Sequence, residues 1–195
     1  MNRNRPPFLE GHYYHFYNRG ARQLSIFREE ENYLFVIRKM RMYCRELHLA
    51  PIAYCLMPNH YHFLIRQDGE KPAGLLPQYL FNSYTKAYNN LYGHSGTLFK
   101  GHYHSKPVEN QSYLLHLCRY IHANPVKDGF VDESEDWPYS NYLEWIGIRQ
   151  GTLVDKEFIK EYFPAKESYI EFVSDYIKTR KLPDEIKSYL DKLEG

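Results

Sequence analysis

The amino-acid sequence predicts an α+β fold: a ferredoxin-like β-α-β-β-α-β antiparallel sheet with an added tyrosine-bearing helix and a helical C-terminal extension. Two observations indicate this fold class. Short aromatic and apolar stretches alternate with longer stretches of helical periodicity, in the order strand, helix, two strands, helix, strand. After Gly129 the strand pattern stops and the composition turns acidic. We therefore expect a core domain at residues 1–130 and an acidic, mostly helical extension at residues 131–195.

The first half of the core predicts a strand, a helix and a hairpin. The aromatic run at residues 12–18 is typical of a strand. Apolar residues at helical spacing predict a helix over residues 29–47, and its three initial glutamates suit the positive end of a helix. Residues 52–57 and 60–66 form two further strands, joined at the turn pair Pro58-Asn59.

The second half of the core predicts a helix over residues 74–92, a strand over residues 98–108 that is interrupted near Gly101, and a helix over residues 111–123. We expect this last helix to stop at Asn124-Pro125, because the residue before a proline avoids helical geometry. Further helices are expected in the extension, near residues 155–163, 166–180 and 184–193.

Charge is distributed unevenly along the chain. Residues 1–130 hold 16 Lys and Arg against 9 Asp and Glu, whereas residues 131–195 hold 9 against 15. All ten histidines lie in the first part. A basic segment rich in His and Tyr favours a partner with phosphates and stackable bases. Chance segregation of charge is the alternative.

Other features bound the class of protein. The three cysteines are odd in number and widely spaced, which argues against a disulfide framework and a four-thiolate zinc site. No stretch reaches the roughly 20 apolar residues of a membrane helix. Residues 1–7 are polar and basic, so we expect no secretory signal and no membrane partner. The expectation is a cytoplasmic protein.

The segment around His60-Tyr61-His62 is the most informative for chemistry. Side chains alternate faces along a strand, so His60 and His62 point the same way, while Tyr61, Phe63 and Ile65 point into the core. Two imidazoles on one face can hold a metal ion; a pair of surface histidines is the alternative. Spacing alone does not exclude two other histidine pairs, His102/His104 and His12/His15.

The helix over residues 111–123 offers a partner group. Tyr113, His116, Tyr120 and Asn124 recur every three or four residues and therefore share one helix face. An exposed tyrosine hydroxyl beside an amide could reach a phosphate bound at the histidine pair. The alternative is a helix whose tyrosines pack at the edge of the core.

These segments resemble a known family. His60-Tyr61-His62 resembles the HUH motif of single-tyrosine transposases, and residues 119–126, Arg-Tyr-Ile-His-Ala-Asn-Pro-Val, resemble their tyrosine helix. The branch that the chain resembles is the REP-associated tyrosine transposases, with a match in the same order over about residues 12–147. Further agreeing segments lie at residues 17–20, 57–60, 96–101, 124–129 and 137–142.

The resemblance implies a transposase chemistry. A divalent metal ion, Mg²⁺ or Mn²⁺, would be held by His60, His62 and Asn124; insertion-sequence relatives carry a glutamine where this chain has Asn124. Tyr120 would be the nucleophile and would form a 5′-phosphotyrosine intermediate. The substrate would be single-stranded DNA with a hairpin, of REP-like or element-end sequence. The enzyme would nick this DNA and rejoin it.

The basic residues of the first part predict the DNA face, with the acidic extension lying elsewhere or opposing DNA binding. The candidates for DNA contact are Arg19, Lys100, His102, His104, Lys106 and Arg119.

Two other functions stay open from the sequence. A non-catalytic single-stranded nucleic-acid-binding module could use the same sheet, with aromatic residues stacking bases. A zinc-binding structural or hydrolytic protein would need a third strong ligand near the histidine pair, and the sequence shows none close by. The chain could act as a monomer or a homodimer, so Tyr120 could reach the histidines of its own chain or those of a partner.

Overall fold

The structure is a computed structural model that describes residues 7–184 and 186–188. Its centre is a four-stranded sheet in the order β2-β3-β1-β4, with every neighbouring pair antiparallel. This order and the alternation with helices confirm the predicted α+β, ferredoxin-like fold. The strands are β1 (Tyr13–Arg19), β2 (Leu49–Met57), β3 (His60–Gln67) and β4 (His104–Val108).

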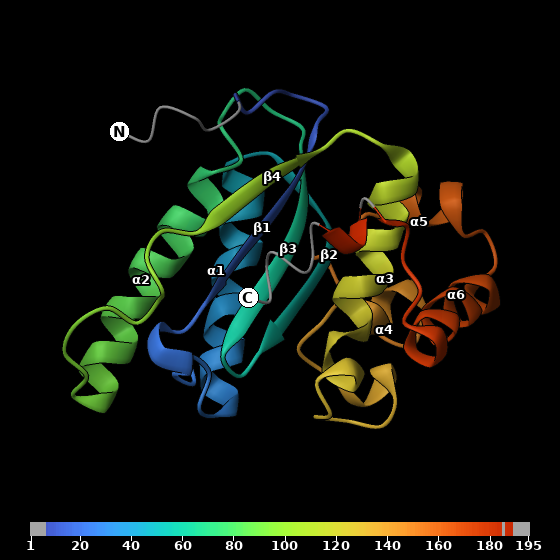
Figure 1. Ribbon diagram of the computed structural model, residues 1–195. Helices are drawn as coiled ribbons and strands as arrows, with labels where there is room; N and C mark the ends of the chain where they lie inside the picture. The colour runs from blue at the N-terminus through green and yellow to red at the C-terminus, as the bar shows by residue number, and fades with distance from the viewer. Residues whose placement is uncertain (1–6, 185, 189–195) are drawn as a thin grey trace.

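One face of the sheet is covered by two helices, α1 (Glu30–Glu46) and α2 (Leu75–Tyr92), as Figure 1 shows. The two-residue period of the strands sends Tyr61 and Phe63 into this layer, where both are buried. Ile65 joins them, as the alternation predicts. A hydrophobic core therefore fills the space between the sheet and helices α1 and α2.

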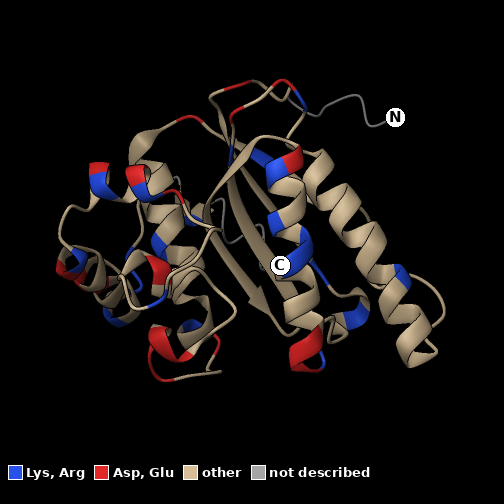
Figure 2. Ribbon diagram, turned by 180° about the vertical axis from the view of Figure 1, so that it is seen from behind, with Lys and Arg blue, Asp and Glu red and all other residues tan. Residues whose placement is uncertain are grey.

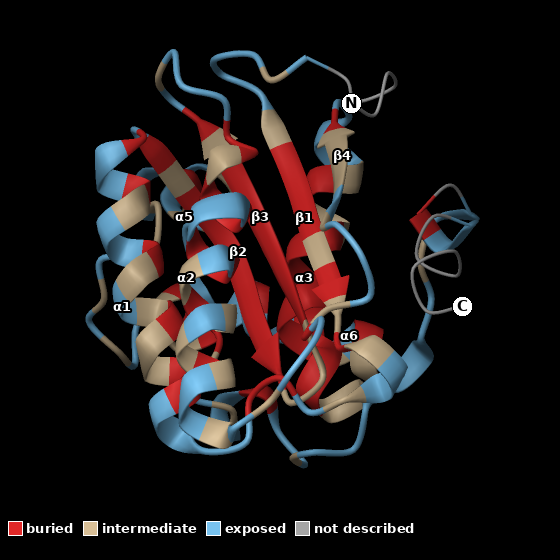
Figure 3. Ribbon diagram, turned by 90° about the vertical axis from the view of Figure 1, so that its left-hand side faces the viewer, coloured by how far each residue is buried: buried red, intermediate tan, exposed pale blue. Residues whose placement is uncertain are grey.

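The other face is covered by α3 (Gln111–Lys127) and by the C-terminal extension (Figures 1 and 3). Buried residues of α3 and of the extension belong to one apolar cluster with the sheet, so the extension completes a second core. The helices of the extension are α4 (Tyr142–Trp145), α5 (Lys156–Tyr162) and α6 (Lys166–Thr179). The helix expected over 184–193 falls largely outside the described residues, although 184 and 186–188 are helical.

The interruption expected near Gly101 in the strand over 98–108 is confirmed: Phe99 forms an isolated bridge with Gly20, the chain turns at Gly101, whose φ is +75°, and β4 begins at residue 104. The predicted end of the last core helix is wrong. The helix expected to stop at Asn124-Pro125 continues to Lys127. Pro125 is buried, and the next turn closes when the Asp128 N–H donates to the Asn124 carbonyl at 2.9 Å. Burial of this segment outweighs the local cost of proline.

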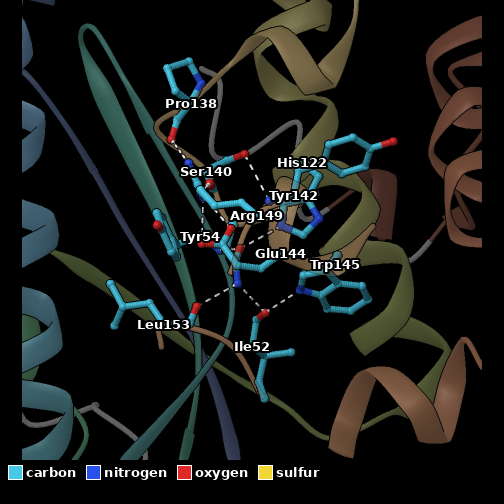
Figure 4. Close-up of polar contacts among 11 residues, drawn as sticks. Ile52, Tyr54, His122, Pro138, Ser140, Tyr142, Glu144, Trp145, Arg149 and Leu153 are labelled. Carbon is cyan, nitrogen blue, oxygen red and sulfur yellow. Dashed lines mark hydrogen bonds and ion pairs between the residues drawn. The ribbon is translucent and has the colours of Figure 1, made fainter. Parts of the chain in front are cut away.

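The segment before α4 is fixed to the outer edge of β2 by the polar contacts that Figure 4 draws. The Tyr54 N–H donates to Oδ1 of Asn141 at 2.8 Å, and Nδ2 of Asn141 donates to the Ile52 carbonyl at 2.9 Å. His122 of α3 lies 2.8 Å from the same Oδ1, through its Nε2. One buried asparagine thus joins β2, α3 and the extension, and the open edge of the sheet is covered.

Among residues 7–184 and 186–188, no helix has both the length and the apolar character needed to cross a bilayer. Acidic residues lie on the C-terminal helices and at the start of α1, interspersed with basic ones (Figure 2).

The three cysteines are free and buried. Burial raises the pKa of the Cys44 thiol to about 12 and raises the pKa values of Cys55 and Cys118 well above the usual value. We expect the native protein not to react with a thiol-specific chromogenic disulfide at pH 8, since the thiolate is the reacting form. The same assay in guanidinium should report all three thiols. Rapid, stoichiometric labelling of the native protein would contradict this burial.

Candidate active site

A cavity of about 610 Å³ opens between α3 and the sheet face that α3 covers. It is polar for its position, with tyrosines, histidines, amides and charged groups around it. Its lining residues are Tyr17, Asn18, Arg19, Gln23, Asn59, His60, His62, Lys100, His104, Tyr120, Asn124, Lys127 and Asp128. Strands β1, β3 and β4, the loops beside them and α3 with its C-terminal cap all contribute.

The histidine pair stands on β3, where the alternation of the strand directs both side chains to this cavity. Their ring centroids are 5.2 Å apart. Each ring has a partner at Nδ1: His60 contacts Oδ1 of Asn59 at 2.7 Å, and His62 contacts Nε2 of His15 at 3.0 Å. For His60 the partner is an acceptor, so its Nε2 carries the lone pair.

Burial keeps these imidazoles neutral. Burial lowers the pKa of His60 to about 4, although the Asp128 carboxylate opposes the shift. Burial, followed by the neighbouring histidines, holds the pKa of His62 well below its usual range. Burial and the Lys106 ammonium lower the pKa of His15 to about 3. The neutral imidazole is the form that ligates metal, and it is present at pH 7.

Helix α3 brings Tyr120 and Asn124 to the same cavity, one turn apart. The Tyr120 ring meets the His62 ring edge-on, with centroids 5.6 Å apart, so one chain suffices to bring the tyrosine to the histidines. Tyr120 is only 2% exposed, which differs from the exposed tyrosine expected from the sequence. Because α3 continues to Lys127, Tyr120 does not lie in the last turn of the helix.

The residues present fit a divalent metal ion. The Nδ2 amide of Asn124 donates to the Tyr120 carbonyl at 3.0 Å, while its Oδ1 is buried with no hydrogen-bond partner among the described residues. This buried carbonyl oxygen accepts no hydrogen bond from the residues that the structure describes and lies at the same cavity as two neutral imidazoles. Together the oxygen and the two imidazole nitrogens are ligands suited to a divalent ion. Within the described part of the chain there is no cluster of three or more His, Cys, Asp and Glu suited to a metal, so the third donor would be this amide.

Of the six predicted DNA-contact residues, three line the cavity and three do not. Arg19, Lys100 and His104 line the cavity. His104 stacks on Tyr17 with ring centroids 4.9 Å apart and an interplanar angle of 12°. His102 is exposed in the turn before β4 and lies outside the lining.

The structure places the other two away from the cavity. Lys106 lies over the Tyr113 ring, with Nζ 4.8 Å from its centroid. Arg119 is 4% exposed and donates to two carbonyls of the extension, those of Phe172 and Lys181. Arg119 thus holds α6 against α3 and does not line the cavity.

Several cavity residues were missed from the sequence. Lys127 and Asp128 fell beyond the predicted end of α3; Lys127 places Nζ 5.0 Å from the Tyr120 ring centroid, and Asp128 lies 4.0 Å from Nε2 of His60. Tyr17 belonged to the aromatic run predicted as a strand and to a segment that resembles the family, but it was not named as a site residue. The two-residue period of β1 could have placed Tyr17 on the cavity side of the sheet, because its neighbour Phe16 is buried on the opposite side.

The antiparallel sheet presents a His-x-His pair to the helix that carries Tyr120, as the resemblance to transposases predicted. The family model described as "Transposase IS200 like" matches residues 9–124, which include all four strands and most of α3. The chain belongs to the IS200-like transposase family.

A more particular likeness is to REP-associated tyrosine transposases. A relative from Haemophilus influenzae that carries this name is 24% identical over 110 residues, which are 51% of this chain and 62% of that protein. A solved REP-associated tyrosine transposase bound to a REP hairpin superposes with a TM-score of 0.63 at 18% identity, over 80% of this chain and 94% of that one. The structural likeness shows the shared fold.

Proposed function

We propose that this chain is a single-tyrosine HUH transposase that nicks and rejoins single-stranded DNA near hairpins. The observation that supports the proposal is the convergence of Tyr120, His60, His62 and Asn124 on one cavity, in a chain of the IS200-like family. A non-catalytic binding module would have no use for a tyrosine packed edge-on against a neutral histidine pair.

In the proposed reaction, Tyr120 is the nucleophile. Its Oη attacks the scissile phosphorus, an Oη–P bond forms as the P–O3′ bond breaks, and the proton lost by Tyr120 balances the one gained by the 3′-oxygen. The product is a 5′-phosphotyrosine and a free 3′-hydroxyl. A second 3′-hydroxyl can reverse the step without ATP, because the phosphodiester energy is kept in the covalent link.

His60, His62 and Asn124 would hold a divalent ion, Mg²⁺ or Mn²⁺, which would act as a Lewis acid on a phosphate oxygen. Basic side chains of this site would attract the DNA phosphates. Lys127 lies over the Tyr120 ring and supplies positive charge where a phosphate must approach. Arg19 and Lys100 line the same cavity and would contact flanking phosphates.

The proposed substrate is single-stranded beside the hairpin. Tyr17 and His104 form a stacked pair of rings at the cavity, and an unpaired base can stack on such rings. The solved relative was bound to a REP hairpin, which supports a hairpin of REP-like or element-end sequence here.

The test is formation of a covalent adduct. The protein is incubated with hairpin oligonucleotides whose single-stranded flanks are randomised on both sides, in the presence of Mn²⁺, and resolved on a denaturing gel. We expect a protein–DNA band that disappears when EDTA replaces Mn²⁺. Tight hairpin binding with no adduct from any flank would favour the non-catalytic module instead.

A further inference from the structure

His15 is a buried histidine that the proposed chemistry does not yet use. It stands on β1, is 0% exposed, and stacks on His62 with ring centroids 5.2 Å apart and an interplanar angle of 18°. Its Nε2 lies 3.0 Å from Nδ1 of His62, so the two rings share a hydrogen bond inside the protein. His15 does not line the cavity, whereas His62 does.

A hydrogen bond between two neutral imidazoles contains one proton, which either of the two facing nitrogens can carry. If Nε2 of His15 carries it, His62 accepts at Nδ1 and must carry its own proton on Nε2. If Nδ1 of His62 carries it, His15 accepts and Nε2 of His62 has a lone pair. Only the second arrangement leaves His62 able to bind an ion at Nε2.

His60 provides an internal comparison. Its Nδ1 faces Oδ1 of Asn59 at 2.7 Å, and an amide oxygen can only accept. His60 is therefore held in the tautomer whose Nε2 carries the lone pair that can ligate an ion. Histidine ligands in metal sites commonly donate their other ring N–H to such a partner, which orients the ring and raises its basicity.

We propose that His15 is a positioning residue for the ion site: its Nε2 accepts the Nδ1–H of His62 and holds that ring in the tautomer that ligates through Nε2. His15 does for His62 what Asn59 does for His60. The inference rests on the proposed function, because it assigns His62 to the ion site.

Two variants separate the hydrogen bond from the ring. His15→Phe keeps an aromatic ring against Tyr17 and His62 but removes the acceptor, while the carbonyl oxygen of His15→Gln can accept at a similar reach. We expect His15→Phe to weaken Mn²⁺ binding by about 10–100-fold in calorimetry without DNA, and His15→Gln to restore most of that loss. His12→Phe is the control, since His12 is exposed and contacts the Glu10 carbonyl; it should leave Mn²⁺ affinity unchanged.

A second measurement needs no metal and no variant. Nitrogen-15 NMR of the metal-free wild-type protein should show His62 protonated at Nδ1 and unprotonated at Nε2. A proton on Nε2 of His62, or a folded His15→Phe that binds Mn²⁺ as tightly as wild type, would overturn the role of His15. If the wild type itself bound no Mn²⁺ while NMR showed the expected tautomer, the ion site of the proposed function would fail and the His15–His62 assignment would stand.

Discussion

Tyr120→Phe is expected to reduce covalent attachment to DNA below detection. The substitution removes the oxygen that would bond to phosphorus in the proposed reaction. It keeps the ring that packs against His62, so the free energy of unfolding should change by about 1 kcal/mol or less. The measurements are the Mn²⁺-dependent adduct on a denaturing gel, hairpin affinity and urea unfolding.

Tyr113→Phe is the matched control. Tyr113 lies two turns earlier on α3, and among the described residues it is not part of the cavity lining. The adduct should survive this change. If Tyr113→Phe abolished the adduct and Tyr120→Phe did not, the nucleophile would be misassigned. If neither change mattered, the tyrosine mechanism would fail for this chain.

Tyr169→Ala is expected to cost about 3–5 kcal/mol of unfolding free energy, a loss typical of a large buried aromatic side chain. Tyr169 is 0% exposed on α6, its ring lies 4.3 Å from that of Trp145 by centroids, and its hydroxyl bonds to Nδ1 of His122 on α3. The substitution would leave a cavity between the extension and the helix that carries Tyr120, and would leave the His122 ring nitrogen without its partner.

Ile170→Ala provides the comparison on the same helix, because Ile170 is 38% exposed. We expect it to change stability by about 1 kcal/mol or less, with urea unfolding as the measurement for both. Equal effects of the two substitutions would mean that the extension is not part of the cooperative core. Removal of the residues after about 150 would then leave the rest of the chain folded. The packing of α6 on α3 predicts instead that this removal unfolds it.

Much of this fold could be predicted because its signals are local. The two-residue period of β3 separates Tyr61 and Phe63 from His60 and His62, and it is readable in eight residues of sequence. The order of strands and helices follows from periodicity in the same way, and the sheet has the predicted topology. The helical period of α3 also places Tyr120 and Asn124 on one face, where the cavity is found.

The sequence by itself therefore determined the elements, their order and the faces of the candidate site. Only the tertiary structure decided what covers each face. Arg119 neighbours Tyr120 in sequence, yet its guanidinium is buried by carbonyls 53 and 62 residues further along. His15 contacts a ring 47 residues away, on the neighbouring strand β3 of the sheet. Such contacts carry no local periodic signal, because they depend on how whole elements pack and on which polar groups that packing removes from water.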